Sequence, residues 1–315
     1  MQYLNSHAGQ ITVPSDAVRA GKTTAVTGRA LVLGSGGVTG VAWEVGLLAG
    51  LAAQGLDLSG ADLVIGTSAG SLAGAQVTSG TGLAELYQAQ IAPDGVEVHA
   101  GMTRELVLRY ALAFALPGSR RRARIRMGKI SLASPDLPES ERSAVIRAWL
   151  PRHEWPSQRL LIVAVDTGSG EWAAFGSGSG VGLIEAVSAS CAVPGVWPPV
   201  RMNGQRWMDG GMRSATNADL AAECARIVVL APLWRGFGLM PGAARQCRRL
   251  ARGGQRSVAL VVPDEAAQAA IGPNLLDSAR RAQAAQAGYA QAATVASQIA
   301  AVWSGGDRVS PAAPS

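Results

Sequence analysis

Cysteine and histidine are scarce in this chain, with three of each among 315 residues. The cysteines lie far apart in the sequence, at Cys191, Cys224 and Cys247. Because their number is odd and no two form a C-x-x-C pair, they predict neither a disulfide framework nor a zinc site. The histidines are equally dispersed, at His7, His99 and His153. We therefore expect no metal site and no cofactor.

Long hydrophobic runs are also missing from the sequence. The longest apolar stretches, such as residues 226–234, fall well short of the roughly 20 residues that cross a bilayer. Residues 1–28 mix polar and charged side chains with apolar ones, and they lack the continuous apolar segment of a secretory signal. The sequence therefore predicts a cytoplasmic protein without a membrane span.

Charged residues make up only 16% of the chain, whereas 48% is apolar. That balance is enough to build one large core or two small ones, and it excludes a disordered or collagen-like chain. The net charge is +6. One run of cations without an intervening acid accounts for this excess, and it consists of Arg120, Arg121, Arg122, Arg124, Arg126 and Lys129. Because the rest of the chain is near neutral, we expect no nucleic-acid partner.

Two units of strand, glycine-rich loop and helix open the folded region. Residues 29–34 form a short apolar run that ends in glycine and predicts a buried strand, and helical spacing of apolar residues follows over 39–54. Residues 61–65 predict a second buried strand, which leads through the loop at 66–70 into a helix ending near Val77. Two such units in succession indicate an α/β fold with a mostly parallel sheet and helices on both faces.

The rest of the chain continues this pattern around one interruption. Further strands are expected at 159–165, 171–175, 226–230 and 257–262, a hairpin at 200–208, and helices at 103–116, 183–191 and about 279–303. We expect one domain over residues 28–303, with flexible tails at 1–27 and 304–315. Residues 80–158 depart from the strand and helix rhythm and predict a helical, arginine-rich insertion or lid.

The segment Gly66-Thr67-Ser68-Ala69-Gly70 fits the pattern G-x-S-x-G at the point where a strand turns into a helix. In a nucleophile elbow the serine occupies a strained turn, and the two glycines let strand and helix approach closely. The helix N-terminus would also direct its positive dipole end at an oxyanion forming beside Ser68. A tight turn in which Ser68 only caps the helix would give the same pattern.

The loop Gly34–Gly40 follows the first predicted strand and contains four glycines. Consecutive small residues at a helix start expose backbone N–H groups that bind anions. The anion could be the oxyanion of a tetrahedral intermediate or the pyrophosphate of a dinucleotide. The dinucleotide is less favoured, because Thr39 occupies the third glycine position of G-x-G-x-x-G. A glycine-rich turn without a ligand is the third interpretation.

An acidic residue stands at the end of the predicted hairpin, in Asp209-Gly210-Gly211. An acid at the end of a strand is held rigidly, and the glycines after it turn the backbone away from its carboxylate. Taken alone, such a residue is more often a turn-forming aspartate.

In this order the three motifs resemble the patatin-like phospholipase family. The segment Ala189–Pro199 also looks like the family's Ala-Ser…Pro…Pro-Pro segment between nucleophile and acid. The resemblance implies a three-layer patatin-like fold, with Ser68 and Asp209 as catalytic residues and the loop at Gly36, Gly37 and Val38 as the oxyanion-binding element. The loop departs from the family, which commonly has a third glycine and an arginine or lysine where this chain has Ser35 and Thr39.

The activity implied by the resemblance is ester hydrolysis of lipids by a Ser–Asp dyad through an acyl-enzyme. Ser68 would attack the ester carbonyl while Asp209 takes its proton. Because the reference pKa of aspartate is about 3.9, we expect Asp209 to be partly desolvated, which raises its pKa. No histidine lies near a motif, so a Ser-His-Asp triad would need one brought in from a distance. The alternatives to the enzyme are a nucleotide-binding protein and a catalytically silent lipid-binding relative.

Two basic clusters suggest a membrane partner. Residues 245–256 place five arginines on one helical face, and together with the run at 120–129 they predict peripheral contact with an anionic membrane. A solvated basic face explains them equally well. The apolar stripe of helix 103–116 is compatible with a lid or with core packing. Trp197, Trp207 and Trp234 are candidates for an acyl pocket or for the core. The sequence does not determine the oligomeric state.

Overall fold

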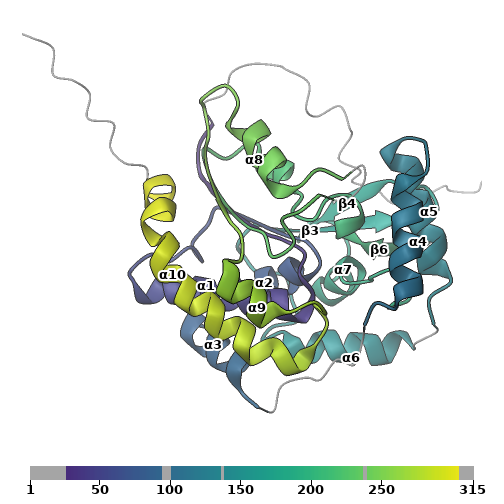
Figure 1. The fold of residues 1–315 in the computed structure, drawn as a ribbon, viewed down its shortest axis with the longest axis horizontal. Helices are drawn as coiled ribbons and strands as arrows, with labels where there is room; N and C mark the ends of the chain where they lie inside the picture. Colours follow the sequence, from purple (N-terminus) through teal and green to yellow (C-terminus); the bar gives the residue numbers. More distant parts are fainter. Residues whose placement is uncertain (1–25, 94–100, 136–137, 237–239, 305–315) are drawn as a thin grey trace, which may run out of the picture.

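The computed structural model describes residues 26–93, 101–135, 138–236 and 240–304. The expected tails at 1–27 and 304–315 lie almost entirely outside these residues. Within them the chain forms a mixed, mostly parallel sheet with helices around it, which confirms the predicted α/β class (Figure 1).

The sheet has eight strands in the described part of the chain. Hydrogen-bonded pairs link them along the path β5-β6-β3-β2-β1-β7-β8, and β4 pairs with β3 as well. The strands are β1 (Arg29–Leu33), β2 (Leu63–Gly66), β3 (Leu160–Asp166), β4 (Trp172–Phe175), β5 (Val200–Met202), β6 (Gln205–Asp209), β7 (Arg226–Leu230) and β8 (Ser257–Val261). Strands β3, β2, β1, β7 and β8 pair in parallel, whereas β4 and β6 run antiparallel to β3. The expected strand positions are confirmed to within two residues.

The helices named by the structure are α1 (Gly37–Ala53), α2 (Ala69–Val77), α3 (Leu83–Ile91), α4 (Arg104–Ala115), α5 (Arg120–Leu132), α6 (Glu139–Trp149), α7 (Leu183–Ser190), α8 (Ala243–Ala251), α9 (Glu265–Ile271) and α10 (Arg281–Trp303). The described residues of the expected insertion form α3 to α6. The short helix α9 has no counterpart in the sequence prediction, and the short helix α3 lies in the insertion, which the sequence predicts only as helical in general. Helices this short are fixed by tertiary packing, because isolated helices under about 12 residues are marginal in water.

The strands divide their side chains between two hydrophobic layers. In β1, Leu31 and Leu33 pack into the core formed with α1, α2 and α10, whereas Ala30 and Val32 face the opposite layer, which contains α8. This alternation follows from the two-residue period of a strand that is buried on both faces. A third cluster packs α4 and α5 against the ends of β3 and β6. Figure 1 shows α1, α2, α9 and α10 together on one side, with α4 and α5 at the far end of the sheet.

The predicted hairpin joins β5 to β6. Its turn residues Asn203 and Gly204 both have positive φ, at 50° and 75°, as a type I′ turn requires. The strand after this turn ends at Asp209, so the hairpin fixes where that carboxylate lies.

No helix in the described residues combines the length and apolar character needed to cross a bilayer.

Candidate active site

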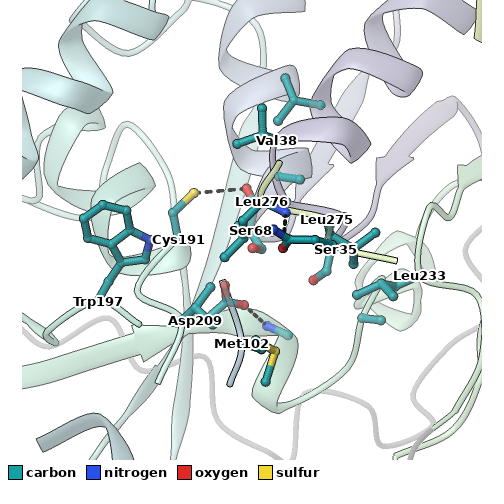
Figure 2. A pocket seen from close by; sticks show the side chains of 18 of the residues that line it. Ser35, Val38, Ser68, Met102, Cys191, Trp197, Asp209, Leu233, Leu275 and Leu276 are labelled. Atoms are coloured by element: carbon teal, nitrogen blue, oxygen red, sulfur yellow. Dashed lines mark hydrogen bonds between the residues drawn. The ribbon is translucent and has the colours of Figure 1, made fainter. Parts of the chain in front are cut away.

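A cavity of about 690 Å³ opens at the carboxyl ends of the central strands and contains both Ser68 and Asp209 (Figure 2). Its walls are mainly apolar and come from α1, α2, α4, α6 and the segment 273–276. Figure 2 shows Asp209 beside Ser68, with Cys191 and Trp197 on one side and Ser35 and Leu275 on the other.

Ser68 occupies the sharp turn between β2 and α2. Its φ is 54°, a left-handed value that is unfavourable for a residue with a β-carbon. The turn depends on the glycines at both ends. A β-carbon on Gly66 would lie 2.5 Å from the carbonyl oxygen of Gly70, and one on Gly70 would collide with the backbone of Leu33. The predicted strand, strained serine and helix are therefore all present.

Asp209 meets Ser68 because two strands run toward each other along the same edge of β3. Gly66 of β2 pairs in parallel with Ile162, and Asp209 of β6 pairs antiparallel with Ala164, only two residues farther along β3. Strand β4 occupies the other edge of β3. The carboxyl ends of β2 and β6 consequently face each other, although they are separated by more than 140 residues of sequence.

The Asp209 carboxylate is buried, with 2% of the residue exposed. Burial raises its pKa to about 6, against the opposing effects of the nearby Ser68 hydroxyl, the Gly211 N–H and the positive charge of Arg142. The Gly211 N–H donates to Oδ1 at 2.7 Å. A buried carboxylate with a raised pKa beside a serine has the properties of a general base for that serine.

Residues 188–198 form hydrogen bonds with both Ser68 and Asp209. The Ser68 N–H donates to the Ser190 hydroxyl at 2.9 Å, and that hydroxyl donates to the carbonyl oxygen of Val163 at 2.7 Å. The Asp209 N–H donates to the carbonyl oxygen of Ala192 at 3.0 Å. The Cys191 thiol lies 3.3 Å from the carbonyl oxygen of Ser68, and burial raises its pKa to about 12. At neutral pH this cysteine is therefore a thiol and not a competing nucleophile.

The glycine-rich loop lies across the cavity from Asp209 and starts α1. Gly36, Gly37 and Val38 line the cavity, and within the described chain their N–H groups make no hydrogen bond. The neighbouring N–H groups are occupied: Gly34 donates to a Glu44 carboxylate oxygen at 2.7 Å, and Ser35 donates to the carbonyl oxygen of Ala215 at 2.7 Å. The backbone N–H groups of the three predicted oxyanion-binding residues are therefore available to bind an oxyanion.

Thr39 occupies the position where the family commonly has an arginine or lysine, and it contacts the segment 273–276. Both the N–H and the hydroxyl of Thr39 donate to the carbonyl oxygen of Leu275, at 3.1 and 3.3 Å. Gly37 has a φ of 60°, and a β-carbon there would collide with the backbone of Leu275. The segment 273–276 therefore fixes the loop geometry and forms one wall of the cavity.

The other candidate residues are distributed between the cavity, the core and the surface. Trp197 lines the cavity, whereas Trp207 packs edge to face against Phe175, and Trp234 is not among the cavity residues. His153 contacts Arg147 on the surface, and His7 and His99 lie outside the described residues. No group of described residues could hold a metal ion.

The first basic cluster lies on α5. Helix α8 ends at Ala251, so only Arg245, Arg248 and Arg249 of the five arginines expected on one helical face lie on it. The two helices lie well apart (Figure 1). Within the first cluster, Arg126 donates to the carbonyl oxygens of Ala113 and Leu116 at the end of α4, and Arg124 donates to that of Gly170. These two arginines therefore have structural partners. Arg120, Arg121, Arg122 and Lys129 are exposed, and Arg121 also pairs with Glu171 at 2.7 Å.

The apolar stripe predicted on α4 faces inward. Leu106, Ala113 and Phe114 are buried, and Tyr110 packs against the same cluster. The outer face of the helix is apolar as well, with Leu108 59%, Leu112 52% and Leu116 48% exposed, whereas the half-exposed Val107 lines the cavity.

Three residues near the site carry no sequence signal that would have revealed them. Arg142 is buried at the cavity wall, Glu44 supports the glycine-rich loop from α1, and Leu275 holds that loop from the other side. None of them belongs to a motif, and each is identified only by the contacts that the fold creates.

Comparison with known proteins assigns the family. A family model described as patatin-like phospholipase matches residues 31–222, more than half of the chain. No curated protein sequence matches significantly. Among solved structures, VipD from Legionella pneumophila aligns with 12% identity and a TM-score of 0.42 over 88% of this chain and 67% of VipD. The type III effector protein ExoU aligns with 15% identity and a TM-score of 0.36 over 86% of this chain and 53% of ExoU.

Thus the chain spans about two thirds of the matched VipD chain and about half of the ExoU chain. These structural likenesses are loose, and the assignment is based on the sequence match, which includes the glycine-rich loop, the Ser68 turn and Asp209. The chain belongs to the patatin-like phospholipase family.

Proposed function

We propose that this protein is a serine acyl hydrolase that cleaves carboxylic ester bonds of phospholipids or other lipids through the dyad Ser68 and Asp209. One observation carries the proposal: a buried aspartate with a raised pKa lies beside a serine in a strained turn, inside a mainly apolar cavity (Figure 2). The family match supports lipid hydrolysis independently.

In the first half-reaction the Ser68 hydroxyl attacks the ester carbonyl carbon while Asp209 takes the hydroxyl proton. The carbonyl oxygen becomes an oxyanion and accepts hydrogen bonds from the N–H groups of Gly36, Gly37 and Val38. Such donors act strongly in a site with few competing waters, and removing one typically raises the barrier by roughly 3 kcal/mol. Protonated Asp209 then gives its proton to the departing alcohol.

In the second half-reaction water replaces the alcohol. Asp209, again ionised, takes a proton from a water molecule that attacks the acyl-enzyme carbonyl. The tetrahedral intermediate collapses as Ser68 regains its proton from Asp209 and the carboxylic acid leaves. One carboxylate therefore serves as base and acid in turn, as microscopic reversibility requires.

The cavity composition favours an acyl chain as the bound group. The walls away from the dyad are formed by large apolar side chains, among them Val41, Leu72, Phe114, Ile146 and Trp149. Burying a methylene group there contributes about 0.8 kcal/mol. A dinucleotide would instead need polar partners for its riboses and phosphates. This composition supports a lipid ester over the nucleotide alternative.

The proposed partner surface for an anionic membrane is the outer face of α4 with the exposed basic residues of α5. Three leucines of α4 and its end face solvent, and Arg120, Arg121 and Arg122 begin the next helix. Apolar anchors flanked by cations are the combination that anionic lipid surfaces bind. The inner face of the same helix lines the substrate cavity through Tyr110 and Phe114.

The test is hydrolysis of a short p-nitrophenyl ester, followed by a panel of phospholipids, lysolipids and simple esters. Wild-type protein is expected to turn over, and Ser68→Ala and Asp209→Asn to lose turnover. Equal rates in all three proteins would refute the enzyme. Liposome binding that persists without any turnover in the wild type would instead identify a silent lipid-binding relative. Thermal stabilisation by NAD or ATP would favour the nucleotide alternative.

A further inference from the structure

The two members of the proposed dyad are both hydrogen-bonded to residues 188–198, a segment that belongs to neither motif. Ser190 accepts the N–H of Ser68 through its side chain, and Ala192 accepts the N–H of Asp209 through its carbonyl oxygen. A displacement of this segment would therefore change the separation between the serine hydroxyl and the carboxylate. The contacts that hold this segment in place are therefore expected to affect catalysis as well as folding.

Arg142 of α6 bonds this segment at both of its ends. One terminal nitrogen donates to the carbonyl oxygen of Ser188, in the last turn of α7, and the other donates to that of Pro198. The residue is 5% exposed and reaches the cavity wall. A planar guanidinium can span two carbonyl oxygens in a fixed geometry, whereas the single ammonium of lysine cannot.

Two further contacts reach the same segment from the preceding helices. The Tyr110 hydroxyl of α4 donates to the carbonyl oxygen of Pro194 at 2.8 Å, and the Gly195 N–H donates to the hydroxyl of Ser134, just after α5, at 2.8 Å. Residues of 80–158 therefore bond the segment at four points. This region, expected from the sequence to be an insertion or lid, supports the site.

We propose that Arg142 is a positioning residue, which sets the geometry of Ser68 and Asp209 by clamping residues 188–198, and that the helices of residues 101–149 act on the reaction through this clamp. The inference rests on the proposed hydrolase function. It assigns a role in the chemistry to a residue that lies outside every motif of the chain.

The charge of Arg142 gives the clamp a second, separable effect. Its positive charge lowers the pKa of Asp209 and of the Cys191 thiol, against the larger effect of burial. The other described groups that act on the Asp209 carboxylate are the Ser68 hydroxyl and the Gly211 N–H, and Tyr110 also faces it. Because burial and the Asp209 charge raise the pKa of Tyr110, Tyr110 stays neutral across the working pH range.

Three variants separate geometry from charge, with initial rates normalised to the number of sites that react with a fluorophosphonate. Arg142→Met removes both the two guanidinium hydrogen bonds and the positive charge. We expect kcat to fall about 100-fold and KM to stay within about twofold of the wild-type value. The acid limb of its pH profile should move to higher pH. Arg142→Lys keeps the charge, so the limb should stay in place while kcat falls about tenfold. Arg147→Met, on the exposed side of the same helix, is the control and should match the wild type.

Unchanged kcat and an unchanged acid limb in Arg142→Met would overturn the proposal, as would a loss confined to melting temperature. Should Arg142→Met fail to fold, Tyr110→Phe removes one bond to the same segment, and a wild-type kcat in that variant and in Arg142→Lys would refute the clamp. An inactive wild type refutes the hydrolase itself. Even then, the charge effect can be tested by measuring the pKa of Asp209 with carboxyl carbon NMR. This pKa is expected to be higher in Arg142→Met than in the wild type, and equal values would contradict the charge effect.

Discussion

The hydroxyl oxygen of Ser190 accepts the backbone N–H of Ser68 at 2.9 Å, across 122 residues of sequence. This bond fixes the turn in which Ser68 has its strained φ of 54°. The same helix end leads to Ala192, which holds Asp209. The geometry of the proposed dyad therefore depends on α7 and the loop after it as much as on the strands that carry the two residues.

Hydrolysis should depend on pH through the ionisation of Asp209. Only the ionised carboxylate can take the Ser68 proton, and burial raises its pKa to about 6. We expect kcat/KM to rise about tenfold per pH unit below that value and to level off above it. A profile for a water-soluble ester, measured from pH 4.5 to 8.5 at constant ionic strength, tests this. Activity that is already full at pH 4.5 would contradict a buried carboxylate base.

Replacing Gly37 by alanine should damage the proposed oxyanion site. The added methyl group would collide with the backbone of Leu275, and the positive φ of 60° is unfavourable for alanine. Movement of the loop would misdirect the N–H donors, and losing one such donor typically lowers kcat by about 100-fold to 1000-fold. Gly60→Ala is the matched control, because no atom lies within 4 Å of its added β-carbon. Equal kcat values for both variants would exclude the loop from the reaction.

Glu44→Gln should stabilise the protein increasingly as the pH rises. Burial raises the pKa of Glu44 well above 4.5, so the folded state binds the proton more tightly than the unfolded state does. The wild type therefore loses stability as the pH rises from about 4.5 through the folded pKa. Glutamine stays neutral and can still accept the Gly34 N–H. Urea unfolding at several pH values measures the difference, and a difference independent of pH would refute the burial of an ionisable group.

Polar substitution on the outer face of α4 should weaken binding to anionic vesicles. Leu108→Ser with Leu112→Ser removes two exposed leucines that do not line the cavity. Because burying a leucine contributes about 1.5–3 kcal/mol, partitioning is expected to fall more than tenfold while hydrolysis of a soluble ester is retained. Vesicle sedimentation measures the partitioning.

The matched charge test compares the two basic helices. Neutralising Arg120, Arg121 and Arg122 together should weaken binding to anionic vesicles and reduce its salt dependence. Neutralising Arg245, Arg248 and Arg249 on the distant α8 should leave it unchanged. Equal losses in both triple variants would indicate nonspecific attraction in place of a defined surface.

The sequence predicts the features that depend on neighbouring residues, and it does not predict those that depend on residues far apart in the chain. The strand, strained serine and helix around Ser68 are set by neighbouring residues and are visible in the glycine spacing. The approach of Asp209 depends on β6 running antiparallel beside β3, a pairing that the resemblance implies but that local pattern does not. Arg142 looks like any other charged residue of an insertion helix, because its role depends on carbonyl groups about 50 residues away.

The segment around Leu275 escaped prediction for a similar reason. It lies beyond the residues that match the family, 31–222, and its contact with Thr39 uses a backbone carbonyl oxygen that no side-chain pattern encodes. The helix before it, α9, has seven residues and is stabilised by packing.

Fluorophosphonate labelling followed by peptide mapping tests the pairing of Ser68 with Asp209 most directly. The reagent needs an activated serine, so the account predicts one adduct on the peptide containing Ser68 in the wild type. No adduct is expected in Ser68→Ala, and labelling should be about 100-fold to 10,000-fold slower in Asp209→Asn, which preserves shape and removes the base. An adduct on another residue, or equal labelling rates in the wild type and Asp209→Asn, would contradict it.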